Sequence, residues 1–288
     1  MPELAATGRG LPGRGRDHDG LVTSPSAGAP VGPRVPPIPT RVTYLGHASL
    51  LLETDGAVLA TDPVCGARIG GFFTRRAAPS TFRPEDLRGV AGVLISHAHH
   101  DHLDYASLAA VPRSVPIAVP WGVAAPLRWR GHADVRVLRR WQRTQFGIWT
   151  VTAVPSRHFG GRLPLVWTSG HQGYVLEGPA CIYFAGDTGF DAPMFRAIAS
   201  RFRIDLAILP IAGAVVPWFR RNHMNAAEAL DAFQLLGASK MLPMHFETFP
   251  ASFEPAGEPR RQLLEASARL GLTASVNLLA PGASLWVT

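Results

Sequence analysis

The sequence is poor in lysine, in cysteine and in long apolar runs. Lys240 is its only lysine, so the net charge of +7 comes from arginine, which points to codon usage rather than to a binding function. Cys65 and Cys181 are too few for a disulfide framework and favour a reduced compartment. No apolar run reaches the roughly 20 residues that a transmembrane helix needs, and the N-terminus lacks the apolar region of a secretory signal. We therefore expect a cytoplasmic protein.

The composition predicts a boundary near residue 40. Residues 1–40 are rich in proline, glycine, alanine and arginine and contain almost no large apolar side chains. Such a segment cannot bury enough surface to offset the entropy of ordering, so we predict a disordered leader. From Arg41 onward, short apolar segments alternate with helical patterns, which predicts a single domain over residues 41–288.

Local patterns predict individual elements of this domain. Asp55-Gly56 predicts a hairpin turn between two short strands. Asn225, with Glu228 three positions later, predicts a capped helix over Ala226 to Leu236. The alternation over Gln145 to Val154 predicts one continuous strand.

A cluster of histidines marks the candidate chemistry. His97-Ala98-His99-His100-Asp101-His102 directly follows an apolar strand, although only 11 of the 288 residues are histidine. Later apolar strands lead in the same way to His158, Asp187 and His245. Side chains at strand ends converge on one edge of a sheet, where α/β folds assemble their sites. A solvated polar loop is the alternative for the cluster alone, but imidazoles and carboxylates together suit zinc or a similar divalent ion.

The order of these residues resembles the ligand set of the metallo-β-lactamase fold hydrolases. The resemblance implies an α/β (α+β) fold, an αββα four-layer sandwich with two divalent metal ions, best matched by Zn²⁺, at one edge. It implies one ion on His97, His99 and His158, a second on Asp101, His102 and His245, and Asp187 as the bridge between them. Two such ions can share a hydroxide that acts as the nucleophile, which makes Asp101 and Asp187 the candidate catalytic carboxylates. His100 lies between two ligands and is expected to point elsewhere.

Further motifs resemble the N-acylphosphatidylethanolamine-hydrolysing phospholipase D group. They are Tyr44-Leu45-Gly46-His47-Ala48-Ser49, Thr61-Asp62-Pro63, Leu94-Ile95-Ser96-His97, Trp167-Thr168-Ser169-Gly170, Pro217-Trp218-Phe219, His223-Met224-Asn225 and Met244-His245-Phe246-Glu247-Thr248-Phe249. The resemblance implies a zinc-dependent phosphoric diester hydrolase of lipid metabolism. Its substrates would be N-acylphosphatidylethanolamine-like phospholipids, attacked by a metal-bridging hydroxide. The chain departs from the group at Phe159-Gly160-Gly161-Arg162, where the group has a longer polar stretch.

Five residues are candidates for roles beside the metals. His47 and His223 are candidates for substrate contact, with a structural role as the alternative for each. Asp62 is expected to accept a hydrogen bond from a ligand imidazole, because ligating histidines usually donate their other N–H. Trp218 and Phe219 predict an apolar loop for an acyl chain or a membrane surface, with core packing as the alternative.

Other functions remain open from the sequence. A lactonase or a small phosphodiesterase, acting on a soluble substrate with the same metals, is the main alternative. A nuclease and a non-catalytic binding protein are weaker alternatives, because no nucleic-acid domain is recognisable and all seven ligand candidates are present. We expect a phospholipid or other phosphodiester substrate, peripheral membrane contact and no nucleic acid, and leave a homodimer open. One arginine cluster could meet anionic lipid headgroups or nucleic acid, with a solvated face as the commoner alternative: Arg128, Arg130, Arg136, Arg139, Arg140 and Arg143.

Overall fold

The computed structural model describes residues 38–69, 74–77, 80–162, 169–213, 219–250 and 254–288. Residues Pro37–Thr288 form one compact unit, whose first strand begins at Thr40. The predicted leader over residues 1–40 lies almost entirely outside the described residues. Within the described part of the chain, no helix is long and apolar enough to span a bilayer.

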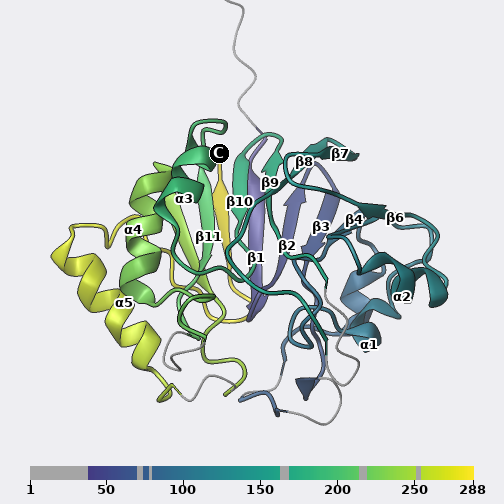
Figure 1. The fold of residues 1–288 in the computed structure, drawn as a ribbon, viewed down its shortest axis with the longest axis horizontal. Helices are drawn as coiled ribbons and strands as arrows, with labels where there is room; N and C mark the ends of the chain where they lie inside the picture. Colours follow the sequence, from purple (N-terminus) through teal and green to yellow (C-terminus); the bar gives the residue numbers. More distant parts are fainter. Residues whose placement is uncertain (1–37, 70–73, 78–79, 163–168, 214–218, 251–253) are drawn as a thin grey trace, which may run out of the picture. The chain divides into compact units, whose positions relative to one another are not determined.

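Two β-sheets form the centre of this unit (Figure 1). In the described residues, the first sheet has the strand order β13-β1-β2-β3-β4-β5-β6 and the second has the order β12-β11-β10-β9-β8-β7. The strands of the first sheet are β1 (Thr40–Gly46), β2 (Ser49–Thr54), β3 (Ala57–Thr61), β4 (Gly92–Leu94), β5 (Ile117–Val119), β6 (Val135–Val137) and β13 (Ser284–Val287). Those of the second are β7 (Arg143–Phe146), β8 (Trp149–Val154), β9 (Gly173–Glu177), β10 (Cys181–Phe184), β11 (Leu206–Pro210) and β12 (Lys240–Met244).

Helices cover the outer faces of both sheets. Figure 1 shows α1 and α2 together beside β4 and β6, and α3, α4 and α5 together beside β11. The described helices are α1 (Tyr105–Leu108), α2 (Ala124–Trp129), α3 (Ala192–Ala199), α4 (Ala226–Leu236), α5 (Glu258–Arg269) and a short 3-10 helix over Pro84–Leu87. The layers therefore run helix, sheet, sheet, helix, which confirms the predicted fold class.

Side-chain alternation builds the two cores of this sandwich. Leu94 of β4 and Ala118 of β5 face the core between the sheets, whereas their neighbours Val93 and Ile117 face the core under α1 and α2. Period-two alternation of this kind follows from strand geometry, with both faces buried. β11 is buried at every position, which explains why its sequence reads as a continuous apolar run.

Strand direction brings the predicted ligands to one edge. β3 and β4 are parallel neighbours in the first sheet, and β10, β11 and β12 are parallel in the second. β8 is antiparallel to β9, which is antiparallel to β10, so β8 and β10 point the same way. The segments that carry His97, His158, Asp187 and His245 follow the carboxyl ends of β4, β8, β10 and β12. They therefore leave each sheet at a single edge.

One predicted strand is two strands. The segment Gln145 to Val154 forms the hairpin of β7 and β8, in which Phe146 pairs with Trp149 across a two-residue turn. Gly147 adopts φ +59° in that turn, a left-handed conformation that glycine tolerates without a steric penalty. The Asp55-Gly56 hairpin and the capping box of Asn225 and Glu228 are confirmed as predicted.

Gly92 lies where the two sheets approach each other, and its replacement tests that contact. A Cβ at this position would meet the Phe146 ring at 2.8 Å and the Leu59 side chain at 3.0 Å, both buried. We expect Gly92→Ala to lower the free energy of unfolding by about 1–3 kcal/mol through overpacking. Gly89→Ala is the matched control, because its Cβ would enter open space. Chemical denaturation measures both, and equal small effects would contradict close packing at Gly92.

Candidate metal centre

One carboxylate oxygen stands at the middle of the predicted ligands. Asp187 Oδ2 lies 3.1 Å from His245 Nε2, 3.2 Å from His102 Nε2, 3.8 Å from His97 Nε2 and 3.9 Å from His158 Nε2. Four imidazoles from three separate segments, the loop after β4 and the ends of β8 and β12, thus point the same ring nitrogen at one oxygen.

The potential ligand atoms form three overlapping groups among the described residues. Within each group all ligand atoms lie within 4.8 Å of one another. The first group is His97, His99, His158 and Asp187; the second is His47, Asp101, His102 and His245; the third is Asp187, His223 and His245. The structure therefore brings together all seven predicted ligands, and His100 belongs to none of the groups.

Hydrogen bonds behind the rings orient the imidazoles. His102 Nδ1 lies 2.7 Å from Asp62 Oδ2 and His158 Nδ1 lies 3.0 Å from the Asn222 carbonyl oxygen, so each Nδ1–H donates outward. His97 Nδ1 lies 2.9 Å from Ser96 Oγ, which itself donates to Asp62 and therefore accepts from the ring. An outward N–H fixes the tautomer and leaves the Nε2 lone pair facing the centre.

Asp62 is the main acceptor of this outer network. Its carboxylate is fully buried and accepts from the Ser96 N–H at 2.7 Å, the Ser96 hydroxyl at 2.5 Å and the His102 ring at 2.7 Å. The hydrogen bond from the His102 ring is the kind of contact that the sequence predicted for Asp62.

Three site residues have left-handed backbones although they are not glycine. The φ values are +57° at His47, +35° at Asp62 and +60° at His245. This conformation is costly for residues with a Cβ and concentrates at functional sites. The His245 N–H donates to the His47 carbonyl at 3.0 Å, which joins the β1–β2 turn of one sheet to the end of β12 in the other.

Burial and charge divide the imidazoles into two kinds. Burial lowers the pKa of His97 and His158 well below the usual range, and that of His99 to about 4, so these rings are neutral. Burial also opposes charge on His102 and His245, but the nearby carboxylates prevail. Asp187 and Asp101 raise the pKa of His102 well above its usual range, and Asp187 raises that of His245 to about 9. The carboxylates thus favour positive charge in the centre.

The residues present fit a divalent metal ion. His102 Nε2, both ring nitrogens of His245 and Asp187 Oδ1 are buried and lack hydrogen-bond partners among the described residues. Polar atoms without partners are costly in a protein interior, and two of these, His102 Nε2 and His245 Nε2, lie 3.2 and 3.1 Å from Asp187 Oδ2. His99 Nδ1 lies 2.8 Å from His97 Nε2 and 3.3 Å from His158 Nε2, three nitrogens that would share a cation.

Two of the remaining candidates, His47 and His223, lie directly beside the candidate ligands. His47 Nε2 lies 3.0 Å from Asp101 Oδ2, and the centroid of its ring lies 4.1 Å from that of the His245 ring, with the two planes tilted by 39°. His223 Nε2 lies 3.4 Å from Asp187 Oδ2, while its Nδ1 donates to the Phe219 carbonyl at 3.2 Å. Both histidines are therefore closer to the ligands than the sequence indicated. Trp218 lies outside the described residues, so its predicted role stays a prediction.

Sequence reasoning missed three contributors. Ser96 links His97 to Asp62, and Arg162 donates to the backbone of the histidine loop. Phe159 is 42% exposed, and its ring lies 4.7 Å from that of His99 and 4.9 Å from that of His158. Adjacency to motif residues was the only sequence signal for them.

Several arginines of the Arg128–Arg143 cluster have internal partners. Arg128 donates to the Val135 carbonyl, Arg130 lies over the Tyr105 ring, and Arg136 forms an ion pair with Asp134 at 2.6 Å. These three of the six arginines therefore have partners within the protein itself.

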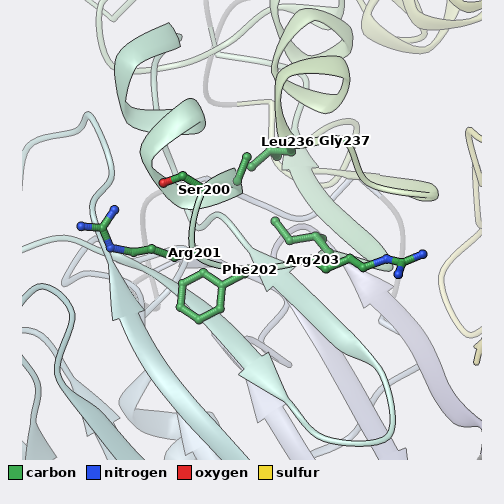
Figure 2. A pocket seen from close by; sticks show the side chains of 8 residues that line it. Ser200, Arg201, Phe202, Arg203, Leu236 and Gly237 are labelled. Carbon is green, nitrogen blue, oxygen red and sulfur yellow. The ribbon is translucent and has the colours of Figure 1, made fainter. Parts of the chain in front are cut away.

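A surface hollow lies away from these ligands (Figure 2). It has a volume of about 410 Å³ and is lined by residues 199–204, Leu236 and Gly237. Residues 199–204 precede β11, whereas His245 follows the parallel strand β12, so the hollow is at the opposite edge of the sheet. Figure 2 shows Arg201 and Arg203 pointing to opposite sides. This hollow is therefore separate from the candidate metal site.

Comparison with known proteins identifies the family. The model of the beta-lactamase superfamily domain matches residues 58–246, and the chain belongs to that superfamily. An uncharacterised protein of Mycobacterium tuberculosis is 35% identical over 82% of this chain and 66% of its own length, so the chain spans just under two thirds of that relative. The N-acyl-phosphatidylethanolamine-hydrolyzing phospholipase D 1 of Caenorhabditis elegans is 31% identical over 77% of this chain and 68% of its own.

Solved structures share the fold. A possible metal-dependent hydrolase from Veillonella parvula superposes with a TM-score of 0.70 at 19% identity, over 85% of this chain and 98% of that one. Together with the family match, this likeness supports membership of the beta-lactamase superfamily, and the His/Asp cluster is its candidate metal site.

Asp62→Asn tests the outer network. The amide keeps the size of the side chain but presents an N–H₂ group to the donors of Ser96 and His102. We expect the affinity for Zn²⁺ to fall about 10–100-fold, measured by competition with a chelator. Asp205→Asn is the control, because Asp205 accepts from the Cys181 N–H just before β11, at the opposite edge. Unchanged zinc affinity in Asp62→Asn would remove Asp62 from the support of the centre.

Proposed function

We propose that the protein is a binuclear, zinc-dependent phosphodiesterase of phospholipase D type that acts on N-acylphosphatidylethanolamine-like phospholipids. The convergence of four imidazole Nε2 atoms on Asp187 Oδ2 carries the reaction class. The relative from Caenorhabditis elegans, which is named for this activity, supports the substrate class.

Two sets of residues would hold the two ions. His97, His99 and His158 would bind one, Asp101, His102 and His245 the other, and Asp187 would contribute to both. Imidazole and carboxylate donors, without a thiolate, suit Zn²⁺. When bound, the ions would supply Lewis acidity toward the phosphoryl oxygens and lower the pKa of water.

The protein's own groups would orient the reactants around these ions. Asp101 accepts a hydrogen bond from His47 at 3.0 Å, and its Oδ2 lies 3.6 Å from His245 Nε2, so the carboxylate is held from two sides. Asp187 is almost fully buried among imidazoles, which keep the pKa of its carboxyl well below the usual range against the effect of burial. Both carboxylates therefore remain ionised and would keep fixed positions beside a bound phosphodiester.

The rim of the centre suits an amphiphilic substrate. The Phe159 ring is partly exposed and stacks on His158, so it offers an apolar surface directly above the ligands. The centroid of the Phe219 ring lies 5.9 Å from that of the His223 ring. An acyl chain or the apolar part of a headgroup would contact these rings, and the enzyme would approach its lipid by peripheral contact with a membrane surface.

A small soluble substrate is the second candidate. A cleft of about 170 Å³ adjoins His47, Asp101 and His245, and Phe246 and Glu254 are among its other lining residues. This volume is below the about 300–1,000 Å³ typical of small-molecule sites, so it would take a small group rather than an acyl chain. A lactone or a short phosphodiester would fit this description.

A substrate panel on zinc-loaded protein tests the proposed function. We expect kcat/KM for N-acylphosphatidylethanolamine in micelles to exceed that for phosphatidylcholine, a sugar-phosphate lactone and a short water-soluble phosphodiester. Asp187→Ala, which removes the shared carboxylate, is expected to abolish all of these activities. A higher kcat/KM for the lactone would favour the second candidate and contradict the first.

Phe159→Ser tests the apolar rim. We expect the apparent KM for micellar lipid to rise several-fold, because burial of an aromatic side chain against apolar groups is worth about 1.5–3 kcal/mol at most. The KM for a short soluble phosphodiester should not change. Trp129→Ser is the control, since Trp129 is an exposed aromatic at the end of α2. Equal losses on both substrates would assign Phe159 to packing instead.

A further inference from the structure

Arg162 connects two ligand-bearing segments that belong to different sheets. It follows His158 by four positions, beyond the end of β8. Its Nη1 donates to the Ala98 carbonyl at 3.0 Å and to the Leu103 carbonyl at 2.6 Å. These two carbonyls flank the stretch from His99 to His102, which follows β4 in the first sheet.

We propose that Arg162 is a positioning residue of the metal centre, a guanidinium clamp that holds the histidine loop in register with His158. The inference rests on the ligand geometry and is independent of the identity of the substrate.

The loop has the shape that such a clamp would hold. The N–H groups of His102 and Leu103 both donate to the His99 carbonyl, at 3.1 and 2.8 Å, so the backbone turns sharply between the ligands. The side chains of Ala98 and Leu103 are fully buried in the core under α1 and α2. With those side chains anchored below, their carbonyls are fixed acceptors. One nitrogen that joins both carbonyls would set the distance between the two ends of the turn.

The guanidinium is itself held in place. Its central carbon lies 4.5 Å from the centroid of the Tyr105 ring, while that of Arg130 lies 3.7 Å from the same centroid. Among the described residues no carboxylate forms an ion pair with Arg162. Its partners are therefore two carbonyls and an aromatic ring, an arrangement that a planar guanidinium satisfies and an ammonium does not.

Loss of this clamp should lower the affinity for metal more than it lowers the stability of the fold. Asp101 and His102 would bind one ion and His99 the other, and all three lie between the bridged carbonyls. Residues that orient ligands from behind typically change metal affinity about 10–100-fold when they are removed. A residue that served only to stabilise the fold would leave the metal affinity of the folded protein unchanged.

The test measures zinc transfer from the zinc-loaded full-length protein to a chelator, together with the visible absorption of the cobalt-substituted protein. We expect Arg162→Met to lower zinc affinity about 10–100-fold and to change the cobalt spectrum. Arg162→Lys should lie in between, because an ammonium can reach a carbonyl but cannot stack on Tyr105. Arg130→Gln is the matched control, since Arg130 shares the Tyr105 ring but donates only to the Pro126 carbonyl. It should match the native protein in both measurements.

Two results would overturn the proposal. One is an Arg162→Met protein whose zinc affinity and cobalt spectrum equal those of Arg130→Gln. The other applies if Arg162→Met does not fold. In that case Arg162→Lys and Tyr105→Leu are measured instead, and native zinc affinity in both variants would contradict the proposal. Loss of lipid hydrolysis alone does not enter the comparison, so a wrong substrate for the enzyme would leave this test intact.

Discussion

The convergence of imidazole Nε2 atoms on the Asp187 carboxylate is the constraint on which the rest of this structure depends. The buried imidazoles and carboxylate leave several ring nitrogens and a carboxylate oxygen without hydrogen-bond partners among the described residues. These buried polar atoms without partners lie at one edge of the sandwich, where segments of both sheets meet. The backbone conformations of His47, Asp62 and His245 are part of the same arrangement, because each turns the chain sharply at the end of a strand.

The outer hydrogen bonds decide which nitrogen each ring presents. Asp62 accepts a hydrogen bond from the Nδ1–H of His102. Ser96 Oγ accepts one from the Nδ1–H of His97, and the Asn222 carbonyl accepts one from the Nδ1–H of His158. Without these acceptors each imidazole could rotate or exchange tautomers, and the centre would lose its geometry. The ligand set therefore depends on residues that never touch a metal, which is also the reasoning behind the role assigned to Arg162.

The sequence could predict that the candidate ligands lie together, because each follows an apolar strand and parallel strands end at one edge. It could also predict the Asn225 cap and the sandwich, through a long and specific motif. It could not predict partners such as the Asn222 carbonyl or the Arg162 clamp, because backbone carbonyls carry no signature and long-range contacts depend on packing. It joined β7 and β8 into one strand because alternation continues through Gly147 and hides the turn. The Arg128–Arg143 cluster suggested a charged face, but contacts with Val135, Tyr105 and Asp134 determine where several of its side chains lie.

Metal stoichiometry tests the central claim most directly. Protein stripped of metal by a chelator is titrated with Zn²⁺, and bound zinc is counted by elemental analysis and by calorimetry. We expect about two ions per chain for the native protein, a rise in thermal stability on binding, and hydrolytic activity that returns with the metal. A stable chain that binds no divalent ion, or one that hydrolyses its substrate equally well with and without metal, would contradict the claim.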